Sequence, residues 1–203
     1  MSGMSRRSPD RRAELLDAAD RVILREGHEV SMVGIAAEAG ITKPILYRHF
    51  GDKSGLYQAL ADRHVRTVIG LLRPEFSGGG PDVRARARAT ITVYLDLISA
   101  NLNLYRFLLH RASAEDSRIR THMSGLVREL GEELGLVLLT EGAAPDPVRA
   151  QVLGHAFVGM VQTTGDWWLE HREVDRSEVV EGLVDVIAAA VIPRGASRTR
   201  QAG

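Results

Sequence analysis

Residues 41–53, ITKPILYRHFGDK, bring together side chains that bind anions. They include both lysines of the chain, whereas every other basic residue among the 26 lysines and arginines is an arginine. Lysine and arginine donate to phosphates and to the O6 and N7 atoms of guanine, and tyrosine and histidine donate to phosphates. These residue types suit a surface that binds nucleic acid, but a solvated surface helix can have the same composition. The elements that position these side chains must decide between the two.

A helix over residues 42–50 divides this segment into two faces. Successive residues turn by about 100° around a helix, so Leu46 and Phe50 share an inner, apolar face. The outer face and its flanks carry the candidates for base reading, which are Lys43, Pro44, Ile45, Tyr47 and Arg48. In recognition helices the N-terminal residues meet base edges in the major groove. A lysine or arginine there can pair with guanine, and an apolar surface such as Pro44 or Ile45 can meet a thymine methyl group.

A second short helix is predicted over residues 31–39, with Ser31 as its N-cap. Both helices are too short to be stable alone, so they must pack on each other. They are joined by the turn AGI, in which Gly40 can adopt the required positive φ, and Ala36 or Ala37 is small enough for the crossing. Two short helices that meet across such a turn form a helix-turn-helix.

Helical spacing recurs along the rest of the chain, and sustained alternation with a period of two is nearly absent. One apolar stripe is predicted in the first helix, over residues 11–25: Leu15, Ala18, Ala19, Val22 and Ile23. Further helices are predicted over residues 53–72, 83–101, 104–111, 119–140, 148–170 and 177–192. The segment RPEFSGGGPD, residues 73–82, separates two groups of helices because three consecutive glycines cannot lie inside a helix.

These elements predict an all-α protein with two domains. The first is a helix-turn-helix domain at residues 8–72, with three helices forming the head and the motif at about residues 31–50. The second is a larger helical regulatory and dimerisation domain at residues 81–193. Residues 1–7 and 194–203 are predicted to be flexible tails.

The segment VSMVGIAAEAGITKPILYRHFGDKSGLYQAL closely resembles the DNA-binding domain of the TetR family of bacterial transcription regulators. The matching pattern lies within residues 13–60 and consists of Ser31 followed by IA..AGI, LYRHF and DK..L. The resemblance implies a homodimer that binds a palindromic operator in double-stranded DNA, usually as a repressor, and is released by a small molecule. The remaining helices are similar to the family's all-helical regulatory domain but carry no comparable motif.

The resemblance also assigns roles to individual residues. It places Lys43, Pro44 and Tyr47 near base edges, and Thr42, His49 and Lys53 at the DNA backbone. We add Arg48 because it lies on the outer face, and Ser31 because its hydroxyl or the amides of its helix N-terminus can bind a phosphate.

Two further features determine how far this surface extends. Some family members read a base with an arginine two positions after Ser31, but this chain has Val33 there, so base reading is expected on the third helix. Four N-terminal arginines can form a basic arm that contacts the minor groove or phosphates, or can belong to a tail that does not touch DNA: Arg6, Arg7, Arg11 and Arg12.

The last two predicted helices are apolar on more than one face, so each needs a second surface to bury against. Pairing with the same helices of a second copy gives a four-helix bundle with a two-fold axis. Such a bundle holds two heads at the separation of roughly 34–36 Å that two half-sites require. Burial within a single chain is the alternative. The predicted dimer contacts are Phe157, Met160, Val161, Trp168, Leu183, Val186 and Ile187.

The candidates for a small-molecule pocket are mostly apolar, which suits a fatty or aromatic effector better than a highly charged one. They are Tyr94, Ile98, Phe107, His110, His122, Leu126 and Gln162. Each of them can equally be a packed core residue. The arginines of RARAR, residues 84–88, can bind an anionic headgroup or form a solvated helix face.

The composition and motifs argue against several other classes of protein. Cysteine is absent, which excludes disulfides, thiolate metal sites and cysteine nucleophiles and agrees with a cytoplasmic location. HExxH, GxSxG and P-loop motifs are absent and the seven histidines are scattered, so we expect no enzyme activity, cofactor or metal site. The longest apolar run, residues 186–192, is far shorter than the ~20 residues that span a membrane. A helical scaffold or adaptor that does not bind DNA remains the main alternative.

Overall fold

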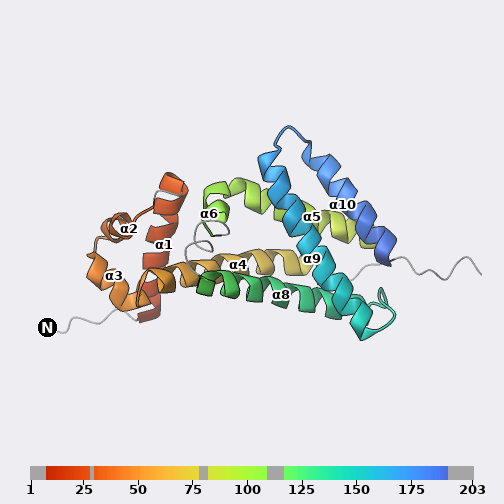
Figure 1. Cartoon of the computed structure of the whole chain (residues 1–203), viewed down its shortest axis with the longest axis horizontal. Coiled ribbons are helices and arrows are strands. Elements are labelled where there is room, and N and C mark those ends of the chain that lie inside the picture. The colour runs from red at the N-terminus through yellow and green to blue at the C-terminus, as the bar shows by residue number, and fades with distance from the viewer. Residues whose placement is uncertain (1–7, 28–29, 78–81, 109–116, 192–203) are drawn as a thin grey trace, which may run out of the picture. The chain divides into compact units, whose positions relative to one another are not determined.

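The structure, a computed structural model, describes residues 8–27, 30–77, 82–108 and 117–191 of the 203-residue chain. Within these ranges there is no β-strand, and the chain forms nine α-helices (Figure 1). They are α1 (Ser8–Glu26), α2 (Met32–Glu38), α3 (Lys43–Phe50), α4 (Lys53–Ser77), α5 (Val83–Ala100), α6 (Leu102–Arg106), α8 (Ser117–Thr140), α9 (Pro147–Glu170) and α10 (Arg176–Val191). The predicted all-α class is confirmed.

Most predicted helix ends agree with the structure within a few residues, because their caps are visible in the sequence. Ser31 and Thr42 occupy the N-cap positions of α2 and α3, and Asp146 caps α9 by accepting a hydrogen bond from the Arg149 amide at 2.8 Å. The stripe predicted for α1 is buried, with every member at most 1% exposed: Leu15, Ala18, Ala19, Val22 and Ile23. Both predicted tails, and residues 109–111 of the predicted helix 104–111, lie outside the described residues.

Helix α4 extends beyond its predicted end at Leu72, to Ser77, although Pro74 lies inside it. Proline lacks the backbone N–H of a helix interior and crowds the preceding turn, so an earlier end was expected. Packing offsets this preference, because Leu72 and Phe76 are buried and Arg73 pairs with Glu133 of α8 at 2.6 Å.

The described residues form two compact units whose division differs from the predicted boundary at residues 73–82. The first unit contains the chain up to Thr67 together with Ala100–Leu126, and the second contains Val68–Ser99 and the chain from Val127 onward. The division follows the contacts between segments and not the composition of residues 73–82. It falls inside α4 and α8, because different turns of these long helices pack in different units.

The first unit is built around a single apolar core that holds α1, α2, α3, the start of α4, α6 and the start of α8 together. Its largest members include Leu15, Ile23, Ile35, Leu46, Phe50, Leu56, Tyr57, Leu60, Phe107 and Ile119. Helix α6 packs on α1, where Asn103 Nδ2 donates to the carbonyl oxygen of Leu24 at 2.9 Å. The core therefore fixes the short helices α2 and α3, which could not be stable alone.

In the second unit, α8 and α9 cross at three glycines that allow their backbones to approach closely. A Cβ atom added to Gly154 of α9 would lie 2.3 Å from the carbonyl oxygen of Gly131 and 2.6 Å from the amide nitrogen of Gly135. No side chain larger than hydrogen fits at such a crossing. Helix α9 also packs on α10 (Figure 1).

The arginines of RARAR form ion pairs inside the second unit. Arg84 and Arg88 of α5 pair with Asp185 and Glu181 of α10, at 2.7 Å and 2.5 Å. The hydrogen bond from Arg88 also lowers the pKa of the Glu181 carboxyl. Arg86 pairs at 2.5 Å with Glu141, directly after α8. Arg84 and Arg88 remain exposed, at 48% and 45%, so they lie on a solvated helix face, one of the two roles considered from the sequence, while also connecting α5 to α10.

None of the helices among the described residues is long and apolar enough to span a membrane.

Candidate nucleic-acid interface

The turn between α2 and α3 has the geometry that a helix-turn-helix requires. The Ser31 hydroxyl accepts a hydrogen bond from the Gly34 amide at 3.0 Å and so fixes the start of α2. At the other end of α2, Gly40 has φ +67°, a left-handed conformation that glycine adopts without strain. The Ile41 amide donates to the carbonyl oxygen of Ala36 at 2.9 Å, which turns the chain toward α3.

A pair of arginines holds α2 against α1. Glu38 of α2 accepts hydrogen bonds from Arg21 at 2.8 Å and from Arg25 at 3.1 Å. Both hydrogen bonds lower the pKa of the Glu38 carboxyl, and the one from Arg21 contributes more than the one from Arg25. The pKa of Arg25 is raised in turn. Its hydrogen bond to the neighbouring Glu26 contributes most, and its hydrogen bond to Glu38 contributes next. The orientation of the motif on α1 therefore combines apolar packing with a charged clamp on the surface.

Helix α3 divides into a buried and an exposed face as its sequence predicts. Leu46 and Phe50 are 0% and 7% exposed and anchor the helix in the core. The exposed residues at its N-terminus and on its outer face are Thr42, Lys43, Pro44, Ile45 and Arg48, and Tyr47 and His49 are half-buried beside them. The Thr42 hydroxyl makes no capping hydrogen bond, in contrast to Ser31. Base-reading and phosphate-binding candidates thus share one accessible surface.

Two apolar side chains also belong to this surface. Ile45 is 37% exposed and Val33 of α2 is 64% exposed, so both present apolar side chains to solvent. The helical wheel had already placed Ile45 on the flank of the outer face. In the sequence, Ile45 is recognisable as part of this surface because it is a large apolar residue on the exposed side of a short amphipathic helix.

The N-terminal arginines that the structure describes are engaged within the protein rather than free to form an arm. Arg12 Nη1 donates to the carbonyl oxygen of His49 at 2.8 Å, and its guanidinium lies 4.5 Å from the centre of the Phe50 ring. Arg11 pairs with Glu14 at 2.7 Å. Both belong to α1, and Arg12 secures the C-terminal end of α3. Residues 6 and 7 lie outside the described residues.

The two lysines each lie over a tyrosine ring. Lys43 Nζ is 5.3 Å from the centre of the Tyr47 ring, and Lys53 Nζ is 5.4 Å from that of Tyr57. Both distances fall within the range of cation–π attraction.

The residues predicted for an effector pocket divide between the two units. Phe107, His122 and Leu126 belong to the first, whereas Tyr94, Ile98 and Gln162 belong to the second, and residue 110 lies outside the described residues. The two apolar side chains of the first unit are core residues, at 1% exposure for Phe107 and 3% for Leu126. In the second unit, Tyr94 and Ile98 pack against the backbone of α9 at Gly165, where an added Cβ atom would meet them at 3.0 and 3.1 Å.

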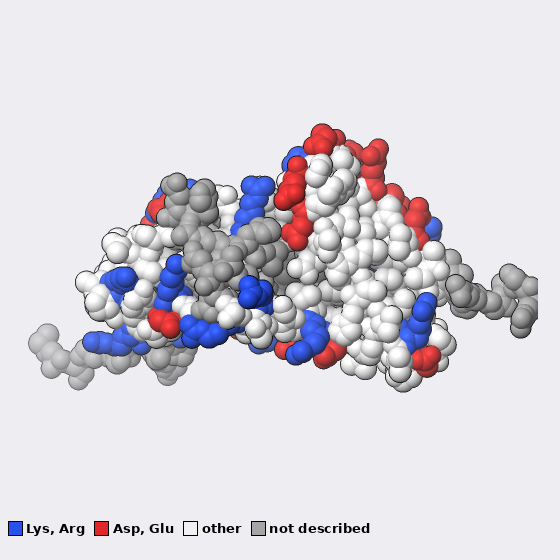
Figure 2. Space-filling model, in the orientation of Figure 1, with Lys and Arg blue, Asp and Glu red and all other residues white. Residues whose placement is uncertain are grey.

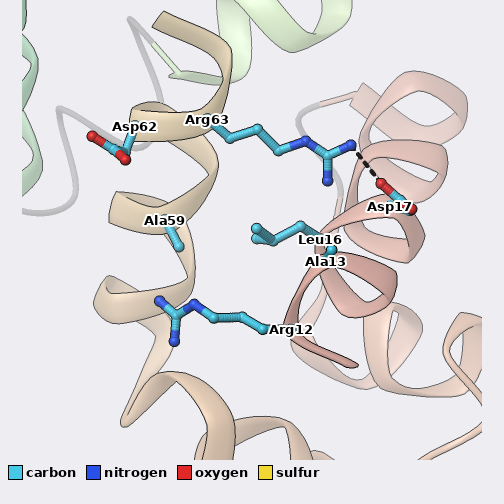
Figure 3. Close-up of a pocket in the computed structure, with 7 residues that line it drawn as sticks. All are labelled: Arg12, Ala13, Leu16, Asp17, Ala59, Asp62 and Arg63. Carbon is cyan, nitrogen blue, oxygen red and sulfur yellow. Dashed lines mark hydrogen bonds and ion pairs between the residues drawn. The ribbon is translucent and has the colours of Figure 1, made fainter. Parts of the chain in front are cut away.

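A cavity of about 300 Å³ lies between α1 and α4 in the first unit (Figure 3). Its lining consists of Arg12, Ala13, Leu16, Asp17, Ala59, Asp62 and Arg63. The charged groups have partners in the protein, since Arg63 pairs with Asp17 and Asp62 pairs with Arg66 of α4 at 2.8 Å. No residue predicted for the effector pocket lines this cavity.

The residues predicted for the dimer interface are mostly buried within one chain. The structure buries Phe157, Trp168, Leu183 and Ile187, with 4% to 8% exposure, because α9 and α10 pack together inside the second unit. Val186 is 53% exposed, and the remaining two, Met160 and Val161, are half-buried. The two apolar faces of each helix look alike in the sequence, and only packing separates the inner residues from the outer ones.

A different stripe of α9 is exposed along the whole helix. Its members recur at three- or four-residue spacing and are uncharged: Val148, Val152, Ala156, Gly159, Thr163 and Trp167. Val148, Val152 and Trp167 are 75%, 54% and 45% exposed. Figure 2 shows a largely uncharged face over α9 and α10, with acidic side chains along the outer edge of α10. An uncharged face of this length is available for association.

Models of two known protein families match the chain. A model described as "Tetracyclin repressor-like, C-terminal domain" matches residues 78–200, and one described as "Bacterial regulatory proteins, tetR family" matches residues 15–60. The chain is 28% identical to the HTH-type transcriptional activator FasR of Mycolicibacterium smegmatis over 177 residues. The matched region covers 86% of this chain and 80% of FasR.

Solved structures show the same fold. A tetR-family transcriptional regulator from Streptomyces coelicolor is similar with a TM-score of 0.72 and 25% identity, over 90% of this chain and 80% of that one. The transcriptional regulator FadR from Bacillus subtilis, solved in complex with stearoyl-CoA, is similar with a TM-score of 0.68 and 16% identity, over 88% of this chain and 97% of that one.

Proposed function

This chain belongs to the TetR family of bacterial regulatory proteins, and we propose that it binds a palindromic operator as a homodimer and represses transcription until a small, largely apolar effector releases it. The observation that carries the proposal is the exposed surface of α3. Lys43, Pro44 and Arg48 project there from a helix whose inner face is fixed by Leu46 and Phe50. Such a helix can enter a major groove without rearrangement of the core.

Different residues of this surface take different parts of the DNA. Lys43 and Arg48 donate to guanine O6 and N7, and Pro44 and Ile45 meet thymine methyl groups. Hydroxyl, imidazole and ammonium groups around the helix bind phosphates and set the register: Ser31, Thr42, His49 and Lys53. Tyr47 lies near the base edges. Ser31 also caps α2, so its backbone neighbours at the helix N-terminus carry part of this role.

The exposed stripe of α9 supports the homodimer. It carries Val148 and Val152 at one end, Trp167 at the other, and the small residues Ala156 and Gly159 between them. Two antiparallel copies of such a helix approach closely at the small residues, and the large residues of one copy cover the ends of the other. A two-fold interface is self-complementary in this way, and it matches the symmetry of a palindromic operator.

The apolar composition of the second unit supports a fatty effector, which acts by favouring a state that does not bind the operator. FadR from Bacillus subtilis, which shares the fold, was solved with stearoyl-CoA. Stearoyl-CoA is therefore the first compound to test, with coenzyme A alone as the control that lacks the acyl chain. Release of operator by the acylated compound alone supports an apolar effector, and release by both points to the nucleotide part.

Activation is the second candidate for the direction of control, because FasR, at 28% identity, is a transcriptional activator. The same DNA contacts serve either outcome, since the sign depends on where the operator lies relative to the promoter. In either case the protein acts on chromosomal DNA in the cytoplasm and needs no catalytic group.

Selection of bound duplexes from a random-sequence library tests the proposal. A regulator enriches a palindromic motif with two half-sites, whereas a scaffold without DNA binding enriches none. The affinity for the enriched duplex should then fall steeply with salt, with a slope of about −0.9 per phosphate contacted in a plot of log K against log salt concentration. Absence of an enriched motif, or an affinity independent of salt, contradicts DNA binding.

A further inference from the structure

The only two lysines of the chain share an arrangement that the predicted DNA contacts do not by themselves explain. Each is followed four residues later by a tyrosine, Tyr47 after Lys43 and Tyr57 after Lys53. Side chains at this spacing lie on the same face of a helix, and both ammonium groups stand over the rings, at 5.3 Å and 5.4 Å from the ring centres.

The two tyrosines differ in their surroundings. Tyr47 is half-buried on the surface of α3, so its own hydroxyl can reach DNA. Tyr57 is 1% exposed in the core of the first unit, so it cannot contact DNA directly. Its ring meets that of Phe107 edge to face, with centres 4.8 Å apart and an interplanar angle of 87°. Phe107 is also 1% exposed, so the position of the Tyr57 ring is set by packing.

A lysine side chain has four rotatable carbon–carbon bonds and loses conformational freedom when it is fixed on a phosphate. An aromatic face beneath the ammonium group restricts those conformations before DNA arrives, and cation–π attraction supplies the restriction. Lysine is a compact point charge that fits over a single ring while its other donors point outward. A lysine side chain that is ordered before DNA arrives loses less conformational entropy when it binds a phosphate.

We propose that Tyr57 is a positioning residue for the contact between Lys53 and a DNA phosphate, and that Phe107 holds the Tyr57 ring in place for it. This rests on the proposed function, since it concerns one contact of the same DNA-binding surface. Tyr57 then affects DNA binding through Lys53. Phe107, which directly follows α6, thereby supports a DNA contact made by Lys53, although it lies 54 residues after Lys53 in the sequence.

The salt dependence of operator affinity measures this contact, because it counts phosphates neutralised and is insensitive to general stability. The experiment uses the full-length chain and the duplex enriched from the random library. Lys53→Met should reduce the steepness of the slope by about 0.9 per chain, or roughly 1.8 for a dimer. Tyr57→Leu should shift the slope toward that of Lys53→Met and lower affinity roughly two- to fivefold, whereas Tyr57→Phe, which keeps the ring, should resemble the wild type.

The decisive comparison is Tyr57→Leu in the Lys53→Met background. If Tyr57 acts through Lys53, the second substitution changes operator affinity by less than about 1.5-fold there, because no ammonium group remains to be positioned. An equal loss in both backgrounds, or an unchanged slope in Tyr57→Leu alone, overturns the proposal. If the wild type enriches no duplex, the proposed function fails instead, so the two failures are distinguishable.

Two further variants separate positioning from folding. Leu60→Ala removes a core side chain one turn further along α4, fully buried and without a lysine above it. It should lower the melting temperature without changing the salt slope. Phe107→Leu carries the test if Tyr57→Leu fails to fold, as judged by circular dichroism. A shallower slope in Phe107→Leu supports the proposal, and the wild-type slope contradicts it.

Discussion

Lys43 stands at the N-terminal end of α3, where side chains of a recognition helix come nearest to base edges. Its ammonium group lies over the half-buried Tyr47 ring and remains exposed to solvent. The arrangement leaves donors free to point toward a groove while the ring limits the directions they can take. We therefore expect the residue at position 43 to influence which DNA sequence is bound, and not only how tightly it is bound.

Lys43→Ala should weaken binding to the enriched duplex by about 1–3 kcal/mol and relax the preference at one base pair of each half-site. The association state should not change, because the side chain is far from α9 in sequence and lies on a different unit. Affinities measured on duplexes with each base pair varied in turn test this. Arg128→Ala removes a charge of the same sign from α8, and it should leave the preference intact. Wild-type preference in Lys43→Ala would show that the reading face is assigned wrongly.

Ile45 and Pro44 make a second prediction possible, because a thymine methyl group can be removed without changing base pairing. Replacing thymines of the operator one at a time by deoxyuridine should lower affinity at one or two positions per half-site. The loss at a position read by Ile45 should be smaller in Ile45→Ala than in the wild type. If every thymine can be replaced without loss, apolar reading by this face is excluded.

At the scale of the elements, the helix-turn-helix depends on a crossing that admits only a small side chain. Ala36 is 2% exposed and its carbonyl oxygen accepts the hydrogen bond that turns the chain into α3. Ala37, its neighbour, is exposed. The sequence offered both alanines for this position, and packing selected one of them.

Ala36→Leu should destabilise the protein by about 1–3 kcal/mol through overpacking. Ala37→Leu is the matched control, since the same side chain added on the exposed side of α2 should change stability by less than about 0.5 kcal/mol. Chemical denaturation followed by circular dichroism measures both. Equal stability of the two variants would argue against a tight crossing at Ala36.

The crossing of α8 and α9 allows a similar test. A methyl group at Gly154 would overlap the α8 backbone at Gly131 and Gly135, so Gly154→Ala should cost at least about 1–3 kcal/mol. At Gly70 of α4, by contrast, an added Cβ atom meets nothing within 4 Å. Gly70→Ala should therefore stabilise the protein by up to about 1 kcal/mol through helix propensity. Thermal unfolding of the two variants should move in opposite directions.

At the scale of the whole molecule, two DNA-reading heads must be held together for a palindrome to be bound as one site. The exposed stripe of α9 is the surface proposed for this, and charge on it should be costly because burial of an unpaired carboxylate is unfavourable.

Val152→Asp should shift the protein from dimer to monomer and lower operator affinity, while the fold of each chain is retained. Leu136→Asp is the control, because Leu136 of α8 is 58% exposed, close to the 54% of Val152, but lies outside the stripe. Sedimentation equilibrium gives the association state, and circular dichroism confirms folding. A dimeric Val152→Asp protein would require a different interface.

Much of the fold was predictable because local rules determine it. Helical spacing located the helices, and the N-cap Ser31 located the start of α2. The inner and outer faces of α3 followed from periodicity alone, since a short helix on a core has only one side to bury. The sequence therefore determined the motif and the residue types that face solvent on it.

Tertiary structure decided what local rules leave open. It buried Phe157 and Trp168 while exposing Val152, because two apolar faces of one helix are distinguished only by what packs on them. It engaged Arg12 with α3 and continued α4 through Pro74, since both depend on partners distant in the sequence. It also placed Phe107 against Tyr57, across a separation that no sequence period encodes. Contacts between distant segments form only when the chain folds as a whole, which is why the sequence alone determined the elements and the structure alone determined their partners.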